Sequence, residues 1–391
     1  MAEAYLVGGV RTPVGRYGGA LASVRADDLA ALVVGEAVRR AGVDPSLVDE
    51  VVLGAANQAG EDNRNVARMA VLLAGLPVTV SAYTVNRLCA SGLTAIANAA
   101  RAVKAGEADV VVAGGVESMT RAPWVMAKPG TPWAKPGEVH DTALGWRFVN
   151  PRHDGEHTIT LGQTAERVAA LDGITREESD AFGLQSQERA AKAIANGAFD
   201  AELVAVPTTK GDVTADETPR ATTMERLAAL RPAFAADGVV TAGTSSPLSD
   251  GASAVVVASE DAVRRLGLVP RARVVTGAAA GVAPQLMGLG PVPATEKALS
   301  RAGWSVADLD AVELNEAFAV QVLASARRLG LDPVTLNADG GAIALGHPLG
   351  SSGARLVVTL LGRLEREQGR RGLATMCVGV GQGASLLVER V

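Results

Sequence analysis

The sequence predicts an α/β fold built from two similar halves, with a long segment inserted into the first half. Three observations support this prediction. Short motifs recur at one constant spacing, strand-like and helix-like stretches alternate in both halves, and residues 117–244 have no counterpart in the second half. Alternating strands and helices imply mostly parallel sheets covered by helices, so two such halves should stack with helices between them.

The internal repeat rests on pairs of small residues. Ala41-Gly42 recurs as Ala302-Gly303, and Ser91-Gly92 recurs as Ser352-Gly353, each 261 residues further along the chain. One such match is weak evidence in a chain with 44 glycines. Several matches at a single offset, in the same order of elements, indicate a duplication.

The first half contains four expected strands and three expected helices. Apolar runs predict strands at residues 4–8, 50–53, 78–84 and 109–113. Helix-like stretches predict helices at residues 26–41 and 63–74 and directly after Cys89, where the chain is rich in alanine.

The second half repeats this order of elements. Strands are expected at residues 272–277, 311–314 and 373–380, and helices at 294–302, at 317–329 and from Ser352 onward. Because the carboxyl ends of parallel strands and the starts of the following helices meet at one edge of a sheet, the active site should form where these ends from both halves come together.

The segment between the halves is rich in proline near its start and has helical stretches at residues 163–171 and 176–196. We expect it to be a loop domain over the active site that carries much of the substrate contact. The domain prediction is therefore residues 1–118 plus 245–270 for the N-terminal half, 119–244 for the inserted loop domain, and 271–391 for the C-terminal half.

Composition limits the classes of function. Apolar residues make up 48% of the chain, charged residues 20%, and the net charge is −5, as in an ordinary soluble enzyme. The charge gives no basic field for nucleic-acid binding, so a phosphorylated substrate would need a local group of Arg or Lys. No apolar run reaches the length of a membrane span, and neither terminus resembles a secretory or peroxisomal signal. We expect a cytoplasmic protein.

The two cysteines of the chain point to thiol chemistry. Cys89 precedes a helix, whose positive end favours thiolate, and Cys377 is followed by Gly379 in a turn of alternating glycines. His347 stands between them in sequence, in a Gly-His-Pro turn. The alternative is that a free cysteine packs as a small hydrophobe. A persistent disulfide is not expected in a reducing compartment.

Two other motifs are misleading. His153-Asp154-Gly155-Glu156-His157 matches a zinc-protease pattern, but that chemistry needs a helix, and Pro151 and Gly155 disfavour one here. We therefore expect no metal, and interpret these histidines as solvated loop residues or neighbours of the pocket. The glycines after Cys377 precede a strand instead of a helix, which disfavours a dinucleotide-binding loop.

Five sequence blocks resemble the signature motifs of the thiolase family. They are Asn86-Arg87-Leu88-Cys89-Ala90-Ser91-Gly92, Gly114-Gly115-Val116-Glu117-Ser118-Met119, Asn315-Glu316-Ala317-Phe318, Gly340 to Pro348, and Cys377-Val378-Gly379. The resemblance covers nearly the whole chain. It implies a five-layered duplicated α/β fold with an inserted loop domain, assembly as a homodimer or homotetramer, and coenzyme A thioesters as substrates, with no further cofactor.

The resemblance also implies roles for individual residues in the thiolytic cleavage of a 3-ketoacyl-CoA, or in the reverse condensation. Cys89 would be the nucleophile that carries the acyl group, and His347 would take its proton. Asn315 would hold a water that forms one oxyanion hole with His347. The backbone N–H groups of Cys89 and Gly379 would form the other. Cys377 would be the acid/base at the acetyl carbon.

Two further residues match positions that contact coenzyme A in the family. Ser246 matches a serine that contacts pantetheine, and Arg220 lies one residue out of register with a basic residue near the nucleotide. The chain departs from the family pattern at Asn337-Ala338-Asp339, where Asn-x-Asn is usual, and at Ser249, where Asn is common. Asp339 is expected to change how the His347 loop is braced.

The acyl specificity stays open between two alternatives. Residues 60–70 and 145–151 resemble the 3-oxoadipyl-CoA thiolases of aromatic degradation, residues 241–250 resemble the thiolases of fatty-acid β-oxidation, and residues 153–162 resemble neither. An adipyl chain ends in a carboxylate, which needs a partner when it is buried. Arg147 is the candidate partner, unless it only braces its loop.

Two rival interpretations come from other classes. A 3-ketoacyl synthase has a similar fold and a nucleophilic cysteine, but pairs it with two histidines or with a histidine and an asparagine. This chain has only four histidines, one of them in a signature turn. A catalytically idle assembly subunit is the second rival, and the occupation of every proposed catalytic position argues against it.

Overall fold

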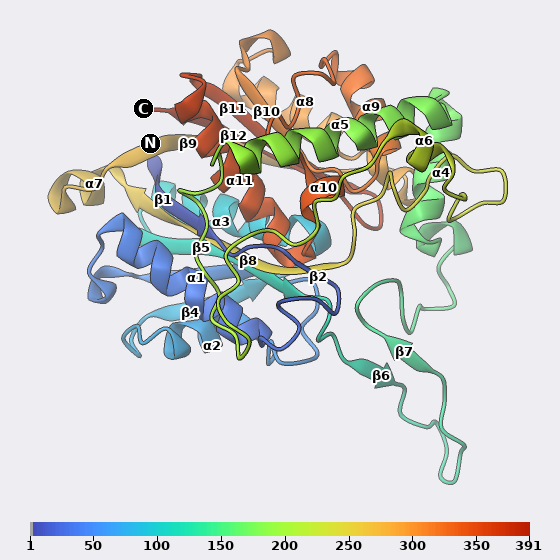
Figure 1. The fold of residues 1–391 in the computed structure, drawn as a ribbon. Helices are drawn as coiled ribbons and strands as arrows, with labels where there is room; N and C mark the ends of the chain where they lie inside the picture. The colour runs from blue at the N-terminus through green and yellow to red at the C-terminus, as the bar shows by residue number, and fades with distance from the viewer. Residues whose placement is uncertain (1–2) are drawn as a thin grey trace.

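The computed structural model describes residues 3–391 (Figure 1). The strands are β1 Ala4–Arg11, β2 Gly15–Arg16, β3 Glu50–Gly54, β4 Ser81–Val85, β5 Val110–Ser118, β6 Trp124–Met126, β7 Val139–Asp141, β8 Ser249–Ser259, β9 Pro270–Gly281, β10 Ala311–Leu314, β11 Arg371–Val378 and β12 Gln382–Arg390. The α-helices are α1 Ala26–Ala41, α2 Val66–Leu73, α3 Ser91–Ala105, α4 Leu161–Asp172, α5 Arg176–Ala195, α6 Met224–Ala228, α7 Glu260–Leu266, α8 Pro291–Ala302, α9 Ala319–Leu329, α10 Ala342–Leu345 and α11 Leu349–Arg366. Short 3₁₀ helices are η1 Pro45–Leu47, η2 Leu88–Ala90, η3 Gly155–Thr158, η4 Pro284–Leu289 and η5 Val306–Asp308.

Hydrogen bonds join both halves into one 10-stranded sheet of order β10-β11-β12-β9-β1-β8-β5-β3-β4, with β2 beside β8. Only β3–β4, β3–β5 and β10–β11 are parallel, so the expectation of mostly parallel sheets is wrong. The reason lies in the connections. A tight turn links β11 directly to β12, and β8 returns from the inserted segment to pair antiparallel with both β5 and β1.

The helices and the two halves of the sheet together form five layers. Helices α1 and α2 cover the outer face of the N-terminal half, and α8 covers the outer face of the C-terminal half. Helices α3 and α11 contact each other and contact strands of both halves, so they form the central layer. The predicted five-layered duplicated α/β fold is confirmed.

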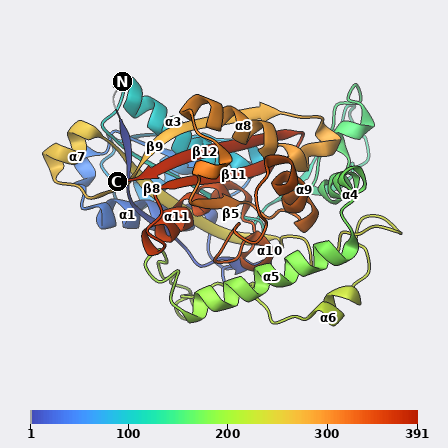
Figure 2. The ribbon, with the colours of Figure 1, turned by 90° about the horizontal axis from the view of Figure 1, so that it is seen from above.

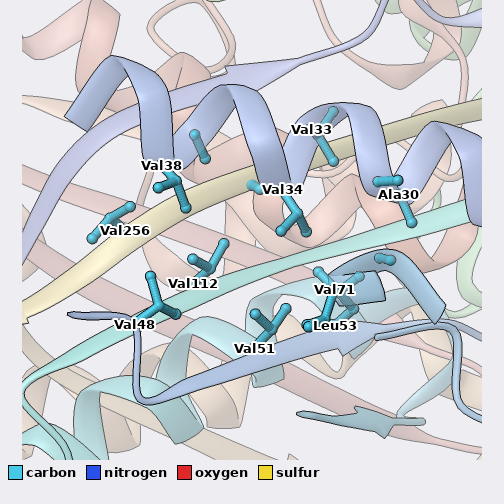
Figure 3. Close-up of a cluster of buried hydrophobic side chains, with 14 of the residues drawn as sticks. Ala30, Val33, Val34, Val38, Val48, Val51, Leu53, Val71, Val112 and Val256 are labelled. Carbon is cyan, nitrogen blue, oxygen red and sulfur yellow. The ribbon is translucent and has the colours of Figure 1, made fainter. Parts of the chain in front are cut away.

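Alternation along the strands builds separate apolar cores on the two faces of the sheet. In β5, Val112 faces the outer core while Val111 faces the central one. Figure 3 shows the outer core of the N-terminal half, where Val34 and Val38 of α1 approach Val112 and Val256 of the sheet. Valine suits both faces of such buried strands, which explains how a chain with 3% aromatic residues fills its interior.

The repeated Ser-Gly pairs mark the crossing of α3 and α11. A Cβ atom on Gly92 would lie 2.7 Å from the carbonyl oxygen of Gly350, and one on Gly353 would overlap the backbone of Leu93. Glycine at both positions lets the two helix backbones touch. The motif that indicated the duplication therefore has a structural role, since it brings together the start of α3, which follows Cys89, and the start of α11, which follows His347.

The inserted segment supplies a helical cover and a projecting arm. Helix α5 contacts α9 and α10, and Figure 2 shows it running along one side of the molecule. Strands β6 and β7 pair antiparallel at the base of an arm that extends well away from the body in Figure 1. Within residues 3–391, no helix has the length and apolar character needed to cross a membrane.

Candidate active site

The central layer and the inserted segment enclose a cavity of about 690 Å³. Its inner wall includes Cys89, Glu117 and Gly379, and its outer wall is the stretch from Thr142 to Asn150. The expectation that the inserted segment lies over the candidate site therefore agrees with the structure. His347, Cys377 and Asn315 are buried behind the cavity wall and are not among the residues that line it.

The turn that carries Cys89 is fixed by its neighbours. Leu88 has φ +46°, a left-handed conformation that is costly for a leucine. The side chain of Asn86 accepts a hydrogen bond from the Leu88 N–H at 2.8 Å, and the Ser91 hydroxyl donates to the Leu88 carbonyl at 2.7 Å. Cys89 thus sits in the short helix η2, one turn before α3, and not in the first turn of the long helix itself.

The backbone N–H groups of Gly379 and of Cys89 itself lie near the Cys89 sulfur and act to lower the pKa of its thiol. Both favour the thiolate, yet burial outweighs them and raises the pKa of the Cys89 thiol to about 11. The expectation of a thiolate produced by the helix end is therefore wrong for the resting site. Cys89 is a thiol at neutral pH, and it needs a base.

Hydrogen bonds fix the tautomer of His347, and burial keeps its ring neutral. Its Nδ1 atom lies 2.6 Å from the Ser352 hydroxyl, which donates its own proton to the Pro348 carbonyl at 2.9 Å. Nδ1 therefore carries the ring proton and donates it to the Ser352 hydroxyl, which leaves Nε2 as the unprotonated nitrogen that can accept a proton. Burial, assisted by the charge of Arg355, lowers the pKa of His347 to about 3.

Asn315 follows β10 and faces the same histidine. Its Nδ2 atom lies 3.3 Å from Nε2 of His347, and its backbone N–H donates to the Thr375 carbonyl at 3.0 Å. The Asn315 Oδ1 atom is buried and has no hydrogen-bond partner within residues 3–391. Asn315 and His347, which were predicted to act together, are thus in contact, and the Asn315 Oδ1 atom stays without a donor within residues 3–391.

Cys377 is the last residue but one of β11, the strand that leads to Gly379. It is 1% exposed and belongs to the apolar core between α9 and the sheet. Burial raises the pKa of its thiol, and the nearby Cys89 raises it further. The two cysteines are thus close enough to interact, and both are protonated at rest.

The predicted contacts of coenzyme A lie outside the cavity lining. The hydroxyl and backbone N–H of Ser246 both donate to the Ala317 carbonyl, at 3.2 and 3.0 Å, which places Ser246 against the loop after Asn315. Arg220 is exposed and donates to the Ala242 carbonyl at 3.1 Å. Neither residue is among those that line the cavity, and their roles stay predictions.

Of the two positions that depart from the family pattern, Ser249 and Asp339, only Ser249 contacts the His347 turn. The Ser249 hydroxyl accepts the backbone N–H of His347 at 3.2 Å, so this position does touch the histidine turn. Asn337 bonds to both backbone groups of Leu314 and to Glu316. Asp339 instead pairs with Arg366 at the far end of α11, away from His347.

His153 and His157 both line the cavity, with ring centroids 6.3 Å apart. Glu156, between them in sequence, pairs with Arg167 at 2.7 Å. The motif forms a loop and the short helix η3, and residues 3–391 contain no group of three potential metal ligands. Of the two interpretations given for these histidines, neighbours of the pocket is the one that agrees with their positions.

Glu117 and Ser352 are important neighbours of the site that sequence reasoning quoted but gave no role. Glu117 was visible only as an acid at the end of an apolar strand, and Ser352 only as part of the repeat. A buried carboxylate at a strand end is a signal that could have been used, because burial of such a group requires hydrogen-bond donors.

A cysteine with two N–H donors, a neutral histidine and a duplicated α/β fold define an acyl-transferring enzyme. Comparison with known proteins agrees: the family model "Thiolase, N-terminal domain" matches residues 4–261, and "Thiolase, C-terminal domain" matches residues 268–390. The chain belongs to the thiolase family. It is an acyltransferase for the thiolytic cleavage of 3-ketoacyl-CoA, which sets aside the 3-ketoacyl synthase interpretation.

Individual proteins show the same relationship over the full length. The chain is 55% identical to the 3-oxoadipyl-CoA/3-oxo-5,6-dehydrosuberyl-CoA thiolase of Escherichia coli strain K12, with 100% of both chains covered. The crystal structure of the Bacillus anthracis acetyl-CoA acetyltransferase superposes with a TM-score of 0.94 at 42% identity, covering 100% of this chain and 99% of that one. Human mitochondrial 3-ketoacyl-CoA thiolase in complex with CoA gives a TM-score of 0.94 at 39% identity and the same coverage.

Proposed function

We propose that this thiolase acts on a 3-ketoacyl-CoA whose acyl chain ends in a carboxylate, such as 3-oxoadipyl-CoA. The observation that carries the proposal is Arg147. It is half-buried, lines the same cavity as Cys89, and makes no side-chain hydrogen bond or ion pair within residues 3–391. An arginine that only braced its loop would be expected to have such a partner.

The other charged or titratable groups of the cavity support this choice. Arg147 is the only arginine or lysine among the lining residues described. The one lining acid, Glu117, is already bonded to three backbone N–H groups, so it does not neutralise Arg147. His153 and His157 add further hydrogen-bond donors near the outer wall. A substrate carboxylate would find a charged partner here without displacing an existing pair.

The relatives support the same substrate class. The name of the Escherichia coli relative specifies two acyl groups, 3-oxoadipyl and 3-oxo-5,6-dehydrosuberyl, and both carry a terminal carboxylate. The acetyl-CoA acetyltransferase and 3-ketoacyl-CoA thiolase structures are less similar in sequence. The similarity therefore favours the dicarboxylic substrate over a simple fatty acyl chain.

In the proposed reaction, Cys89 attacks the 3-keto carbonyl as its proton passes to Nε2 of His347. The bond between C2 and C3 then breaks, and the Cys377 thiol protonates the departing carbanion to give acetyl-CoA. The thiol of a second coenzyme A gives its proton to the Cys377 thiolate and attacks the acyl-Cys89 thioester. The Cys89 thiolate departs and takes its proton back from Nε2 of His347, so both cysteines and the histidine return to their starting states. In this proposal the backbone N–H groups of Cys89 and Gly379 stabilise the oxyanion on the acyl carbonyl, and Asn315 and His347 stabilise the enolate oxygen.

The substrate class is tested by Arg147→Ala, with Arg152→Ala as the matched control. Arg152 is exposed on the same segment, bonds to Asn150 and does not line the cavity. Loss of a charge-assisted pair should lower kcat/KM for 3-oxoadipyl-CoA by about 10- to 100-fold and leave acetoacetyl-CoA within about twofold. Arg152→Ala should change neither. An equal loss on both substrates in Arg147→Ala would mean a structural role and would contradict the proposal.

A further inference from the structure

Glu117, near the end of β5, accepts hydrogen bonds from three backbone N–H groups that belong to both halves of the molecule. Its Oε2 atom accepts from Ala56 at 2.9 Å and from Gly350 at 2.9 Å, and its Oε1 atom accepts from Asn57 at 3.1 Å. Ala56 and Asn57 belong to the loop after β3 and form part of the cavity wall. Gly350 belongs to the first turn of α11, three residues after His347.

Helix α11 has no capping side chain of its own. Its N-cap is Pro348, which offers no hydrogen-bonding side chain, so the first N–H groups of the helix need acceptors from elsewhere. The Glu117 side chain provides one such acceptor at the start of this 18-residue helix. The cap of a helix in the second half is thus supplied by a strand of the first half.

Close backbone packing surrounds this cap. A Cβ atom on Gly115 would overlap the Gly350 carbonyl, and one on Gly350 would lie 2.8 Å from the Gly54 carbonyl oxygen. The start of α11 therefore rests directly on the ends of β3 and β5, with no side chains between them. Glu117 accepts hydrogen bonds from backbone N–H groups that this contact removes from water.

We infer that Glu117 is a positioning residue that caps α11 from the opposite half and so fixes the His347 turn relative to Cys89. Helix η2, which carries Cys89, contacts the same helix α11. A change at the cap would move the base and the nucleophile relative to each other without removing either. The inference rests on the proposed roles of His347 and Cys89, but it does not depend on the acyl group, so Arg147 plays no part in it.

The test compares Glu117→Gln and Glu117→Ala with Glu202→Gln. The glutamine keeps one carbonyl oxygen for Ala56 and Gly350, but its amide nitrogen would face the Asn57 N–H. Glu202 is a buried acid that accepts from Arg11 at 2.5 Å and from Thr359 of α11 at 3.2 Å, and it does not line the cavity. It therefore serves as a control for the general cost of losing a buried acid next to the same helix.

We expect Glu117→Ala to lower kcat for acetoacetyl-CoA thiolysis about 100-fold, the cost of misplacing catalytic groups by about 1 Å, with Glu117→Gln intermediate. KM for coenzyme A should change little. Alkylation of Cys89 by iodoacetamide at pH 7 should slow in both variants, because the base is displaced. Glu202→Gln should lower the unfolding temperature but keep both the alkylation rate and kcat.

Three results would overturn the inference. The first is a folded Glu117→Ala or Glu117→Gln enzyme with wild-type kcat and alkylation rate. The second is loss of activity in Glu117→Gln and Glu202→Gln in proportion to their unfolding temperatures. The third is a loss confined to 3-oxoadipyl-CoA, which would place Glu117 in acyl recognition. If Glu117→Ala fails to fold, Glu117→Gln decides the question. Failure of the substrate proposal appears separately, in Arg147→Ala.

Discussion

At the scale of single residues, burial decides the protonation states of the site. The sequence placed Cys89 before a helix and so predicted a thiolate, but the desolvation of a buried sulfur outweighs two N–H donors. The same burial keeps His347 neutral. These two effects complement each other, because a protonated thiol needs a base and a neutral imidazole can act as one. Exposure cannot be read from motif positions, which is why this part was not predictable.

The alkylation of Cys89 tests its protonation state. With a pKa of about 11, the rate of labelling by iodoacetamide should keep rising through pH 8 and 9. Pre-incubation with acetyl-CoA should protect Cys89 by forming the acetyl-enzyme. The measurement is mass spectrometry of the labelled peptides across pH. A rate that levels off near neutral pH would contradict the raised pKa, and label mainly on Cys377 would contradict the nucleophile assignment.

Assays of the two partial reactions should separate the roles of Cys89 and Cys377. In Cys377→Ser, Cys89 and His347 remain, so acetyl transfer from acetyl-CoA to the enzyme should persist while thiolysis of acetoacetyl-CoA is lost, because a serine hydroxyl is a poor acid/base at neutral pH. Cys89→Ser should lose both reactions. Trapping of the radiolabelled acetyl-enzyme measures the first step, and loss of the enolate absorbance of acetoacetyl-CoA measures the second. Near wild-type thiolysis by Cys377→Ser would disprove the two-cysteine mechanism.

His347 should also make the fold sensitive to acid. Its pKa is about 6.5 when unfolded and about 3 when folded, so below pH 6.5 the unfolded state binds more protons and stability falls. Relative to His347→Asn, wild-type should lose about 2 kcal/mol of unfolding free energy between pH 7 and pH 5. Glu117, whose pKa burial raises to about 7, acts in the opposite direction and is present in both proteins. Denaturant unfolding at the two pH values measures the difference, and equal values at both would contradict a neutral buried histidine.

At the scale of elements, local patterns predicted the helices better than the strands. The predicted helix at residues 26–41 agrees with α1, which Gly42 ends in a left-handed conformation. Strand β8 was missed and β9 was predicted too short. The strand after the glycines that follow Cys377, which is β12, was expected without bounds. Their pairing is antiparallel and joins residues far apart in sequence, as in β1 with β9. Alternation of strand and helix predicts parallel units and carries no information on such pairs.

The crossing of α3 and α11 gives a prediction at this scale. Gly353→Ala should lower stability by about 1–3 kcal/mol and reduce activity, because the added Cβ would push apart the helices that carry the two sides of the site. Gly267→Ala is the matched control. Gly267 ends α7 with φ +64° and nothing within 4 Å of an added Cβ, so it should cost about 1 kcal/mol and leave activity unchanged. Equal effects of both changes on activity would contradict the role of the crossing.

At the scale of the whole molecule, the projecting arm carries large apolar side chains that the fold leaves exposed. The arm comprises residues 124–141, and its large apolar side chains face solvent: Trp133 is fully exposed and Trp124 is 75% exposed. Exposed aromatic side chains gathered on a projecting segment mark contact surfaces in soluble proteins. The homo-oligomer expected from the family resemblance would cover them. The resemblance predicted an assembly, but nothing in the sequence pattern located the surface, because the arm lacks the periodicity of a packed element.

We therefore expect Trp133→Ser to weaken self-association. Trp133 lies outside the cavity lining, so thiolysis of acetoacetyl-CoA by the smaller species should remain within about threefold of wild-type, since surface changes away from a site seldom alter it. Lys128→Ser, an exposed change on the same arm, should keep the wild-type mass. Light scattering coupled to size-exclusion chromatography over a dilution series measures the mass of each protein. The same mass for Trp133→Ser and wild-type at every dilution would show that the arm is not the contact that holds the assembly together, and a monomeric wild-type would contradict the assembly itself.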